Sequence, residues 1–198
     1  VRDPCNTKRQ IRMSSESHMP NTERTSDERL TDLRSHLERD PGFSFLRDLE
    51  TEHAASEAFL VGGIVRDGII GRPAKDYDFI IRGVPARDLE SFLQSRGKVV
   101  LVGRNFGVFK FRPHGWPEEL EDIDIALPRT EHAEGTGGYR DVEAQADPAL
   151  SIADDLSRRD FTMNAMALDV RSGTLVDPFG GRNDLDAKVI RAVRDPHE

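Results

Sequence analysis

The sequence predicts a domain of the α/β (α+β) class, because short apolar strands alternate with helical segments along it. The first sign is at residues 59–81, which contain a buried strand, a glycine turn, a helix, a second turn and another strand. The second is at residues 85–127, where a helical pattern is followed by strand-like runs. The length of 198 residues suits one domain, and 36% apolar residues is low enough that part of the chain is expected outside the core.

The residues that precede this domain are predicted to form two parts. Residues 1–25 are polar and have no apolar period, so they are expected to be disordered. Residues 26–57 are expected to form a helical lead-in, in which Thr25 and Glu28 have the spacing of a capping box. A second short helix follows Pro41-Gly42. We expect the apolar side chains of both helices to serve packing, namely Leu30, Leu33, Leu37, Phe43, Phe45, Leu46 and Leu49.

A Gly62-Gly63 turn separates the first strand of the domain from its helix, and it is predicted to bind an anion. Glycine allows the backbone to approach a ligand closely, and the start of a helix offers free N–H groups and the positive end of the dipole. Arg66 lies about one helical turn beyond Gly63, so we expect it to point back toward the same anion.

The next strand is predicted to carry a pair of carboxylates, Asp76 and Asp78. Strand side chains alternate between faces, so these two share a face about 7 Å apart, while Tyr77 and Phe79 point to the core. Neighbouring carboxylates repel each other, and a hard divalent cation such as Mg²⁺ removes that cost because it takes oxygen ligands. A glycine turn, an arginine and an Asp-x-Asp pair in this order indicate a site for a nucleoside triphosphate with its metal.

The elements that follow are a helix, which we expect to end at Gly97, and a set of strands. Asp122 and Asp124 share one face of the last of these strands. A metal-binding role is favoured for Asp124, whereas Asp122 is expected to belong to a solvated acidic edge. The helix is predicted at residues 85–95, and the strands at 98–102, 108–112 and 123–127.

Residues 129–151 are polar, contain glycine and are long for a connection, so we expect a mobile loop on the substrate side. His132 lies in this loop without a partner at metal-ligand spacing. A closing hairpin is predicted at residues 166–170 and 174–176, followed by a short helix near Leu185.

Residues 152–167 are expected to form one helix that places Arg158, Arg159 and Asp160 in a single turn. Guanidinium groups bind phosphate in bidentate geometry, which suits a triphosphate. Asp160 and Asn164 are four residues apart, and they are candidates for ribose contact or for orienting the arginines. A solvated surface cluster of these charges is the alternative.

Three segments of the chain resemble the signatures of one family. Residues 60–67 read LVGGIVRD and precede a Gly-Arg loop and the Asp-x-Asp pair, residues 155–167 read DLSRRDFTMNAMA, and residues 175–181 read LVDPFGG. In this order they resemble the class II tRNA nucleotidyltransferases and the bacterial poly(A) polymerases. The resemblance extends over residues 59–193.

The resemblance implies a polymerase-beta-like nucleotidyltransferase fold, which is a small mixed sheet with helices mainly on one side. It implies transfer of CMP or AMP from CTP or ATP to the 3′-hydroxyl of an RNA, and we expect tRNA 3′-CCA addition. Asp76, Asp78 and Asp124, the last at the family's third acidic position, would be the catalytic ligands of two Mg²⁺ ions. The residues expected to contact the nucleotide are Gly62, Gly63, Arg66, Arg158, Arg159, Asp160 and Asn164.

The same resemblance predicts the domain boundaries and leaves alternatives open. Residues 58–182 would be the catalytic head, and residues 183–198 the start of a truncated neck. The neck motif that selects the base, and the body and tail domains that hold the RNA, lie beyond these motifs and are expected to be absent. A poly(A) polymerase head, or a non-catalytic nucleotide-binding module that needs a separate neck and body, remains an alternative.

The composition limits the partners and the cellular location that we expect for the protein. The formal charge of -8, with 28 basic and 36 acidic residues, argues against a broad basic surface for nucleic acid but permits an RNA end in a local pocket. One cysteine, Cys5, excludes an internal disulfide, so a cytoplasmic protein is expected. No apolar run is long enough for a membrane span, and no membrane partner is expected.

Overall fold

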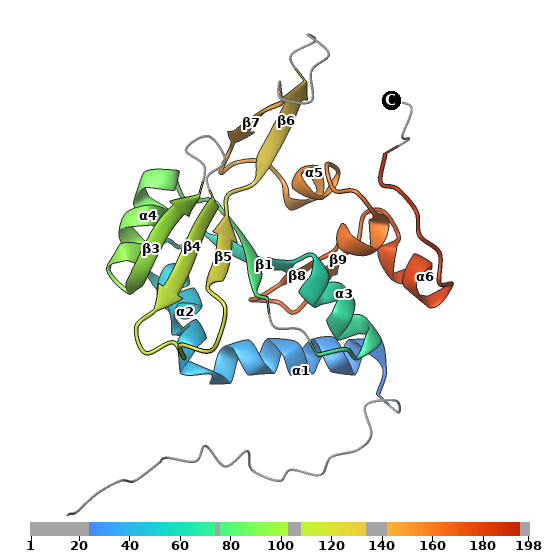
Figure 1. The fold of residues 1–198 in the computed structure, drawn as a ribbon, viewed down its shortest axis with the longest axis horizontal. Helices are drawn as coiled ribbons and strands as arrows, with labels where there is room; N and C mark the ends of the chain where they lie inside the picture. The colour runs from blue at the N-terminus through green and yellow to red at the C-terminus, as the bar shows by residue number, and fades with distance from the viewer. Residues whose placement is uncertain (1–23, 74–75, 103–107, 134–141, 195–198) are drawn as a thin grey trace, which may run out of the picture.

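The computed structural model describes residues 24–73, 76–102, 108–133 and 142–194 (Figure 1). The predicted disorder of residues 1–25 therefore lies almost entirely outside the described residues. Thr25 is described, and it forms the predicted capping box with Glu28 at the start of helix α1 (Ser26–Arg39).

A single mixed sheet forms the centre of the fold, as predicted (Figure 1). All neighbouring strands in it are antiparallel except β2 and β5, which run parallel. The strand order is β3 (Gly97–Val102), β4 (Val108–Pro113), β5 (Ile123–Ala126), β2 (Asp78–Arg82), β1 (Glu57–Val61), β8 (Ala167–Asp169) and β9 (Leu175–Val176).

Successive side chains of the central strands pack on opposite faces of the sheet. Leu60 and Phe79 belong to the larger apolar cluster, whereas Phe59 and Ile80 belong to a smaller one on the other face. Four helices supply side chains to the larger cluster, so helices lie mainly on one side of the sheet, as predicted. They are α1, α2 (Ser44–Glu52), α3 (Gly63–Ile70) and α4 (Ala86–Gln94).

Aromatic packing joins the lead-in to the strand that carries the aspartates. Phe43, at the end of a short 3₁₀ helix η1 (Pro41–Phe43), lies 4.7 Å from Tyr77 between ring centroids. The same ring makes an edge contact with Trp116 at 5.4 Å. Tyr77 therefore faces the core between Asp76 and Asp78, as the strand alternation predicts.

The smaller apolar cluster is covered by side chains from the segment that begins with helix α5. Ile152 and Leu156 of helix α5 (Ile152–Leu156) pack there with Ala165. A 3₁₀ turn, η2 (Thr162–Asn164), and helix α6 (Gly181–Asp186) continue the chain, and buried Thr162 and Asp184 join them by a hydrogen bond of 2.7 Å.

The prediction of one helix over residues 152–167 was wrong. Helix α5 ends at Leu156, and Phe161 is extended with φ -122° and ψ 146°. Phe161 pairs with Ala192, and residues 167–169 pair with β1 as strand β8. These backbone pairs with distant segments outweigh the local helical pattern, because propensity is a weak preference compared with tertiary contacts.

Three other expectations need correction. The expected loop at residues 129–151 contains an antiparallel pair, β6 (Arg129–Ala133) with β7 (Val142–Ala146), because a ladder of backbone hydrogen bonds does not require apolar side chains. Gly97 does not end the helix, since α4 stops at Gln94; it begins β3, where a Cβ would lie 2.2 Å from the carbonyl oxygen of Arg112. Asp76 also precedes β2 and is not part of it.

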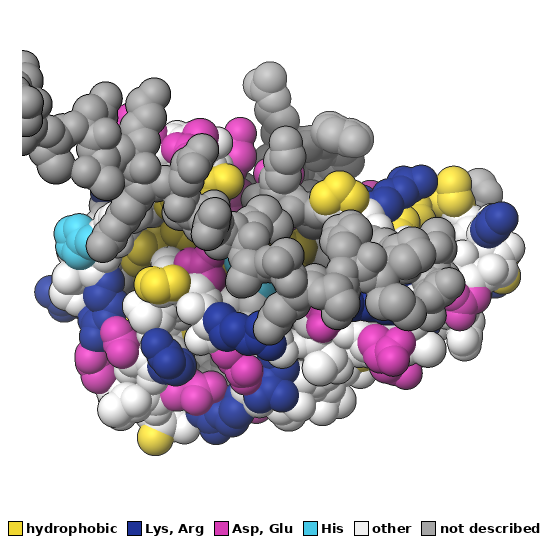
Figure 2. Space-filling model, turned by 90° about the horizontal axis from the view of Figure 1, so that it is seen from below, with side chains coloured by type: hydrophobic (Ala, Val, Ile, Leu, Met, Phe, Trp, Pro, Cys, Tyr) yellow, Lys and Arg dark blue, Asp and Glu magenta, His cyan; other side chains and the backbone are white. Residues whose placement is uncertain are grey.

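The surface charges are mixed in sign where they are visible from the side of α1 (Figure 2). Arg34 and Glu38 of α1 form an ion pair at 2.7 Å, and Arg24, which precedes the helix, pairs with Asp32. The described side chains that are visible on this face include charges of both signs. Among the helices in the described part of the chain, none is long and apolar enough to cross a membrane.

Candidate functional site

The glycine turn brings two distant parts of the chain together. Gly62 has φ 74° and ψ -136°, a conformation that only glycine adopts readily. A Cβ at this position would lie 3.0 Å from Nη1 of Arg159 and 3.7 Å from Oδ2 of Asp78. The turn therefore packs directly against a residue of the Arg-Arg-Asp segment and against one of the predicted metal ligands.

The first turn of helix α3 is the place at which the glycine pair predicts an anion. Among the described residues, no side chain caps α3, whose N-cap is Gly62. Its first N–H groups are therefore available beside Gly63, at the positive end of the helix dipole.

Sheet topology places two predicted carboxylates side by side. Asp78 and Asp124 are register partners on the parallel strands β2 and β5. Burial is the largest cause that raises the pKa of Asp78, to about 6, followed by repulsion from Asp124; Arg159 opposes the rise and Asp76 adds to it. Asp78 therefore lies where a negative charge is costly until a cation balances it.

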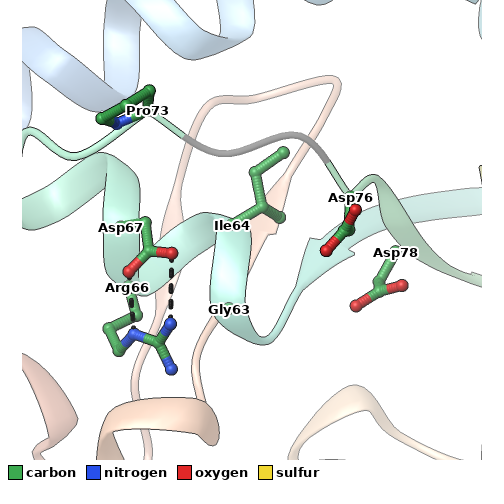
Figure 3. Close-up of a pocket in the computed structure, with 7 residues that line it drawn as sticks. All are labelled: Gly63, Ile64, Arg66, Asp67, Pro73, Asp76 and Asp78. Carbon is green, nitrogen blue, oxygen red and sulfur yellow. Dashed lines mark hydrogen bonds and ion pairs between the residues drawn. The ribbon is translucent and has the colours of Figure 1, made fainter. Parts of the chain in front are cut away.

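A pocket of about 340 Å³ opens between the glycine turn and the aspartates (Figure 3). In Figure 3 the carboxylates of Asp76 and Asp78 lie beside the first turn of α3. The residues that line the pocket are Gly63, Ile64, Arg66, Asp67, Pro73, Asp76 and Asp78.

Arg66 is held by neighbours in this pocket. Its Nε donates to Asp67 at 2.9 Å, and its Nη1 donates to Oδ1 of Asn164 at 2.8 Å. Asn164 in turn donates from Nδ2 to Asp160 at 3.2 Å. Three of the predicted nucleotide-binding residues thus form one chain of hydrogen bonds, in which Asp160 and Asn164 orient Arg66, although no continuous helix connects them.

A second pocket, of about 180 Å³, lies on the other side of Asp78. Asp78 lines both pockets, so it is the point at which they meet. Arginine side chains face the two aspartates here, which suits a phosphate chain whose charge a cation also shares. The charged residues that line this pocket are Asp78, Asp124, Arg129, Arg158 and Arg159.

Asp155 was not among the predicted site residues, yet it organises the arginines. Its side chain is fully buried, and Oδ1 accepts from Nε of Arg158 at 3.0 Å and from the backbone N–H of Arg129 at 3.1 Å. Its position three residues before Arg158 is the signal that the sequence offered. One buried carboxylate therefore joins α5 to the start of β6.

Arg159 extends from the same segment toward Gly62 and Asp78. Its Nε is buried and has no hydrogen-bond partner among the described residues. Burial is the main cause that lowers the pKa of this guanidinium, although Asp155 and Asp78 oppose the change. A buried donor without a partner costs free energy that an anionic ligand can recover.

Two basic residues of β4 neutralise the acidic face of β5. Lys110 Nζ lies 2.8 Å from Oδ1 of Asp124, and Arg112 Nε lies 2.6 Å from Oδ1 of Asp122. Asp122 is therefore part of an ion pair with Arg112, and its expected place in a solvated acidic edge outside the metal site stays a prediction. Lys110 was not predicted, although its place in an alternating strand next to the acidic strand could have revealed it.

The donor set suits a divalent cation. Asp78 and Asp124 present carboxylate oxygens at one register position, and hard cations prefer such ligands. In the described ranges, however, no group of three acidic, histidine or cysteine side chains is close enough to hold one ion as arranged. The shared site of Asp76, Asp78 and Asp124 therefore stays a prediction.

Comparison with known families settles the family. The model of the poly A polymerase head domain matches residues 58–191, which include every predicted site residue. The chain belongs to this family. As a poly A polymerase head domain it has the polymerase-beta-like fold that was expected, since solved CCA-adding enzymes share its architecture.

Known relatives of this head domain are considerably longer than the chain. A multifunctional CCA protein of Stenotrophomonas maltophilia (strain K279a) is 44% identical over 135 residues, which are 68% of this chain and 30% of the relative. One of Xylella fastidiosa (strain M23) is 42% identical over 137 residues, 69% of this chain and 30% of the relative. The chain thus spans about a third of the length of these relatives.

Solved structures of CCA-adding enzymes also resemble the head domain, at a lower sequence identity than the relatives above. A CCA-adding enzyme in its apo form II has a TM-score of 0.63 and 29% identity, covering 86% of this chain and 38% of that one. The Bacillus stearothermophilus CCA-adding enzyme in complex with CTP has a TM-score of 0.59 and 29% identity, covering 78% and 34%. The Thermotoga maritima enzyme complexed with tRNA has a TM-score of 0.57 and 29% identity, covering 86% and 36%.

Proposed function

We propose that this head domain transfers CMP and AMP from CTP and ATP to the 3′-hydroxyl of a tRNA, and so builds the 3′-CCA end. The observation that carries the proposal is that Asp78 lies at the junction of two pockets, beside Asp124 and opposite the arginines. The relatives are multifunctional CCA proteins, and similar structures were solved with CTP and with tRNA, which supports the choice of substrates.

The protein groups that would bind the triphosphate come from two of the three family signatures, residues 60–67 and residues 155–167. The free N–H groups at the start of α3 and the guanidinium of Arg159 lie on either side of Asp78 and would bind phosphate oxygens. Arg158, held by Asp155, would add a second guanidinium. Arg66, which lines the first pocket and is held by Asn164, would also contact the triphosphate, while Asp160 and Asn164 are the candidates for ribose contact.

Asp76, Asp78 and Asp124 would hold Mg²⁺, and we propose two ions. Bound Mg²⁺ would lower the pKa of the attacking hydroxyl and balance the charge that develops on the phosphates. The chain itself would orient the nucleotide, because Asp78 and Asp124 lie on the sheet and the two arginines directly follow helix α5. No protein nucleophile is required for this direct transfer.

A labelling assay tests the proposal. The purified chain would be mixed with Mg²⁺, labelled CTP or ATP, and tRNA that lacks its 3′ end, beside an Asp76→Ala/Asp78→Ala control. Incorporation of both nucleotides that vanishes in the control is the expected result. Incorporation of ATP alone would favour poly(A) addition, which the family description also names. ATP binding without any transfer would identify a nucleotide-binding module that requires the remaining domains of its relatives.

The cellular location follows from the same proposal. We place the protein in the cytoplasm, where the RNA substrate and both nucleotides are present.

A further inference from the structure

Lys110 and Asp124 form an ion pair across the antiparallel strands β4 and β5. Nζ of Lys110 lies 2.8 Å from Oδ1 of Asp124, and the two residues are direct register partners. Their side chains are 46% and 39% exposed, so the pair is open to solvent and its partners can exchange. On its other side, Asp124 is the register partner of Asp78.

The ion pair with Lys110 distinguishes the surroundings of Asp124 from those of Asp76 and Asp78. Asp76 and Asp78 line the pocket beside α3, and Lys110 is not part of that lining. The ammonium group lies against the carboxylate of Asp124, which would otherwise be a ligand of a cation shared with Asp78. A cation that uses Oδ1 of Asp124 must therefore displace an ammonium group, whereas one that uses Asp76 and Asp78 need not.

We propose that Lys110 is a positioning residue that holds Asp124 in the cation-free protein, and that a second divalent cation binds only in exchange for its ammonium group. The inference rests on the proposed function, because it takes Asp124 as a metal ligand. A first cation would bind at Asp76 and Asp78 without breaking the pair. The two ions should therefore differ in affinity, and Lys110 should set the weaker of the two dissociation constants.

The test is a titration of the full chain with Mn²⁺, in which free Mn²⁺ is followed by electron paramagnetic resonance. Lys110→Met is expected to tighten the weaker dissociation constant about 2- to 5-fold, as loss of one exposed ion pair predicts, and to leave the tighter one unchanged. Lys98→Met is the matched control, because it removes the same charge from the neighbouring strand β3. Lys98 lies there opposite Arg112 and away from Asp124 in the register. Lys110→Arg, which keeps the charge, should bind both ions as the unchanged protein does.

A direct readout follows the ion pair itself. In a spectrum of ¹⁵N-labelled lysine ammonium groups, the signal that disappears in Lys110→Arg belongs to Lys110. It should shift as Mg²⁺ occupies the weaker site, while the signal of Lys98 should stay in place. Circular dichroism of each variant checks that the fold is retained.

Two results would overturn the inference, and they differ from each other. If Asp78→Asn removes the tighter Mn²⁺ site but Lys110→Met binds the weaker ion like Lys98→Met, the metal site stands and the role of Lys110 is wrong. If Asp78→Asn binds as much Mn²⁺ as the unchanged chain does, the metal site of the proposed function is wrong. The proposed role of Lys110 is then wrong as well.

Discussion

Asp78 and Asp124 lie opposite each other on β2 and β5, the one parallel pair among the described strands of the central sheet. Forty-six positions of sequence separate them, so their proximity is a product of the topology and not of local structure. The repulsion that results raises the pKa of Asp78, after burial as the larger cause. This cost in the free protein is the physical reason to expect a cation at the site.

Replacement of Asp78 by Asn should abolish transfer and should stabilise the cation-free fold. Because the carboxylate is partly buried beside Asp124, its removal relieves repulsion and desolvation worth about 1 kcal/mol after allowance for solvent screening. Urea denaturation without divalent cations measures the change, and the labelling assay measures transfer. A variant that is less stable by more than about 1 kcal/mol would show that Asp78 serves the fold.

The stability of the cation-free protein should depend on pH through Asp78. Its pKa is about 6 in the folded chain and 3.8 as a reference, so the folded state binds more protons between these values. The free energy of unfolding therefore loses this contribution as pH rises from about 4 to about 6, and the loss is complete above that range. The measurement is the difference between the unchanged protein and Asp78→Asn across this window. Parallel curves for the two proteins would contradict the prediction.

Gly62→Ala should lower both stability and nucleotide affinity. The φ of 74° strains any residue with a side chain, at a cost of about 1–3 kcal/mol, and the new Cβ would lie 3.0 Å from the guanidinium of Arg159. Thermal denaturation and ATP binding measure the two effects. Gly63→Ala is the control, because its Cβ would make an ordinary contact of 3.5 Å with Arg66. Equal losses in the two variants would exclude a specific role for the backbone of Gly62.

Asp155→Asn should cost about 3 kcal/mol of unfolding free energy, because it leaves Arg158 without its buried anionic partner. Nucleotide affinity should fall with it, since Arg158 would no longer be held toward the second pocket. Asp154→Asn on the same helix is the control; Asp154 is exposed and bonds to the helix cap Ser151, so a loss below about 1 kcal/mol is expected. Similar losses of unfolding free energy in the two variants would show that Asp155 has no special role in holding Arg158.

Local patterns in the sequence predicted the elements whose reasons are local. The capping box of α1, the glycine turn and the alternation of Tyr77 with its two aspartates are all found as expected. Helix α4 and strands β3 to β5 also follow from periodicity within one segment. The predicted boundaries of the head and neck remain predictions.

The parts that the sequence did not predict depend on distant partners. Helix α5 stops early because Phe161 pairs with Ala192 and because β8 joins β1. Spacing indicates Asp155 beside Arg158 and Lys110 in a strand next to an acidic one, but not the partners that the fold gives them. Asp155 also contacts the backbone of Arg129 at the start of β6, and Lys110 pairs with Asp124 across β4 and β5. Nothing in one segment states which other segment will face it.

The contact between Phe43 and Tyr77 bears on where this domain can be divided. The region of family similarity begins at residue 58, yet the aromatic ring behind the Asp-x-Asp pair rests on a residue of the preceding lead-in. The segment that the family model matches therefore leaves out part of the packing behind the Asp-x-Asp pair. A chain trimmed to residues 58–191 would keep every predicted site residue and would lose the aromatic ring that supports the segment of Asp76 and Asp78.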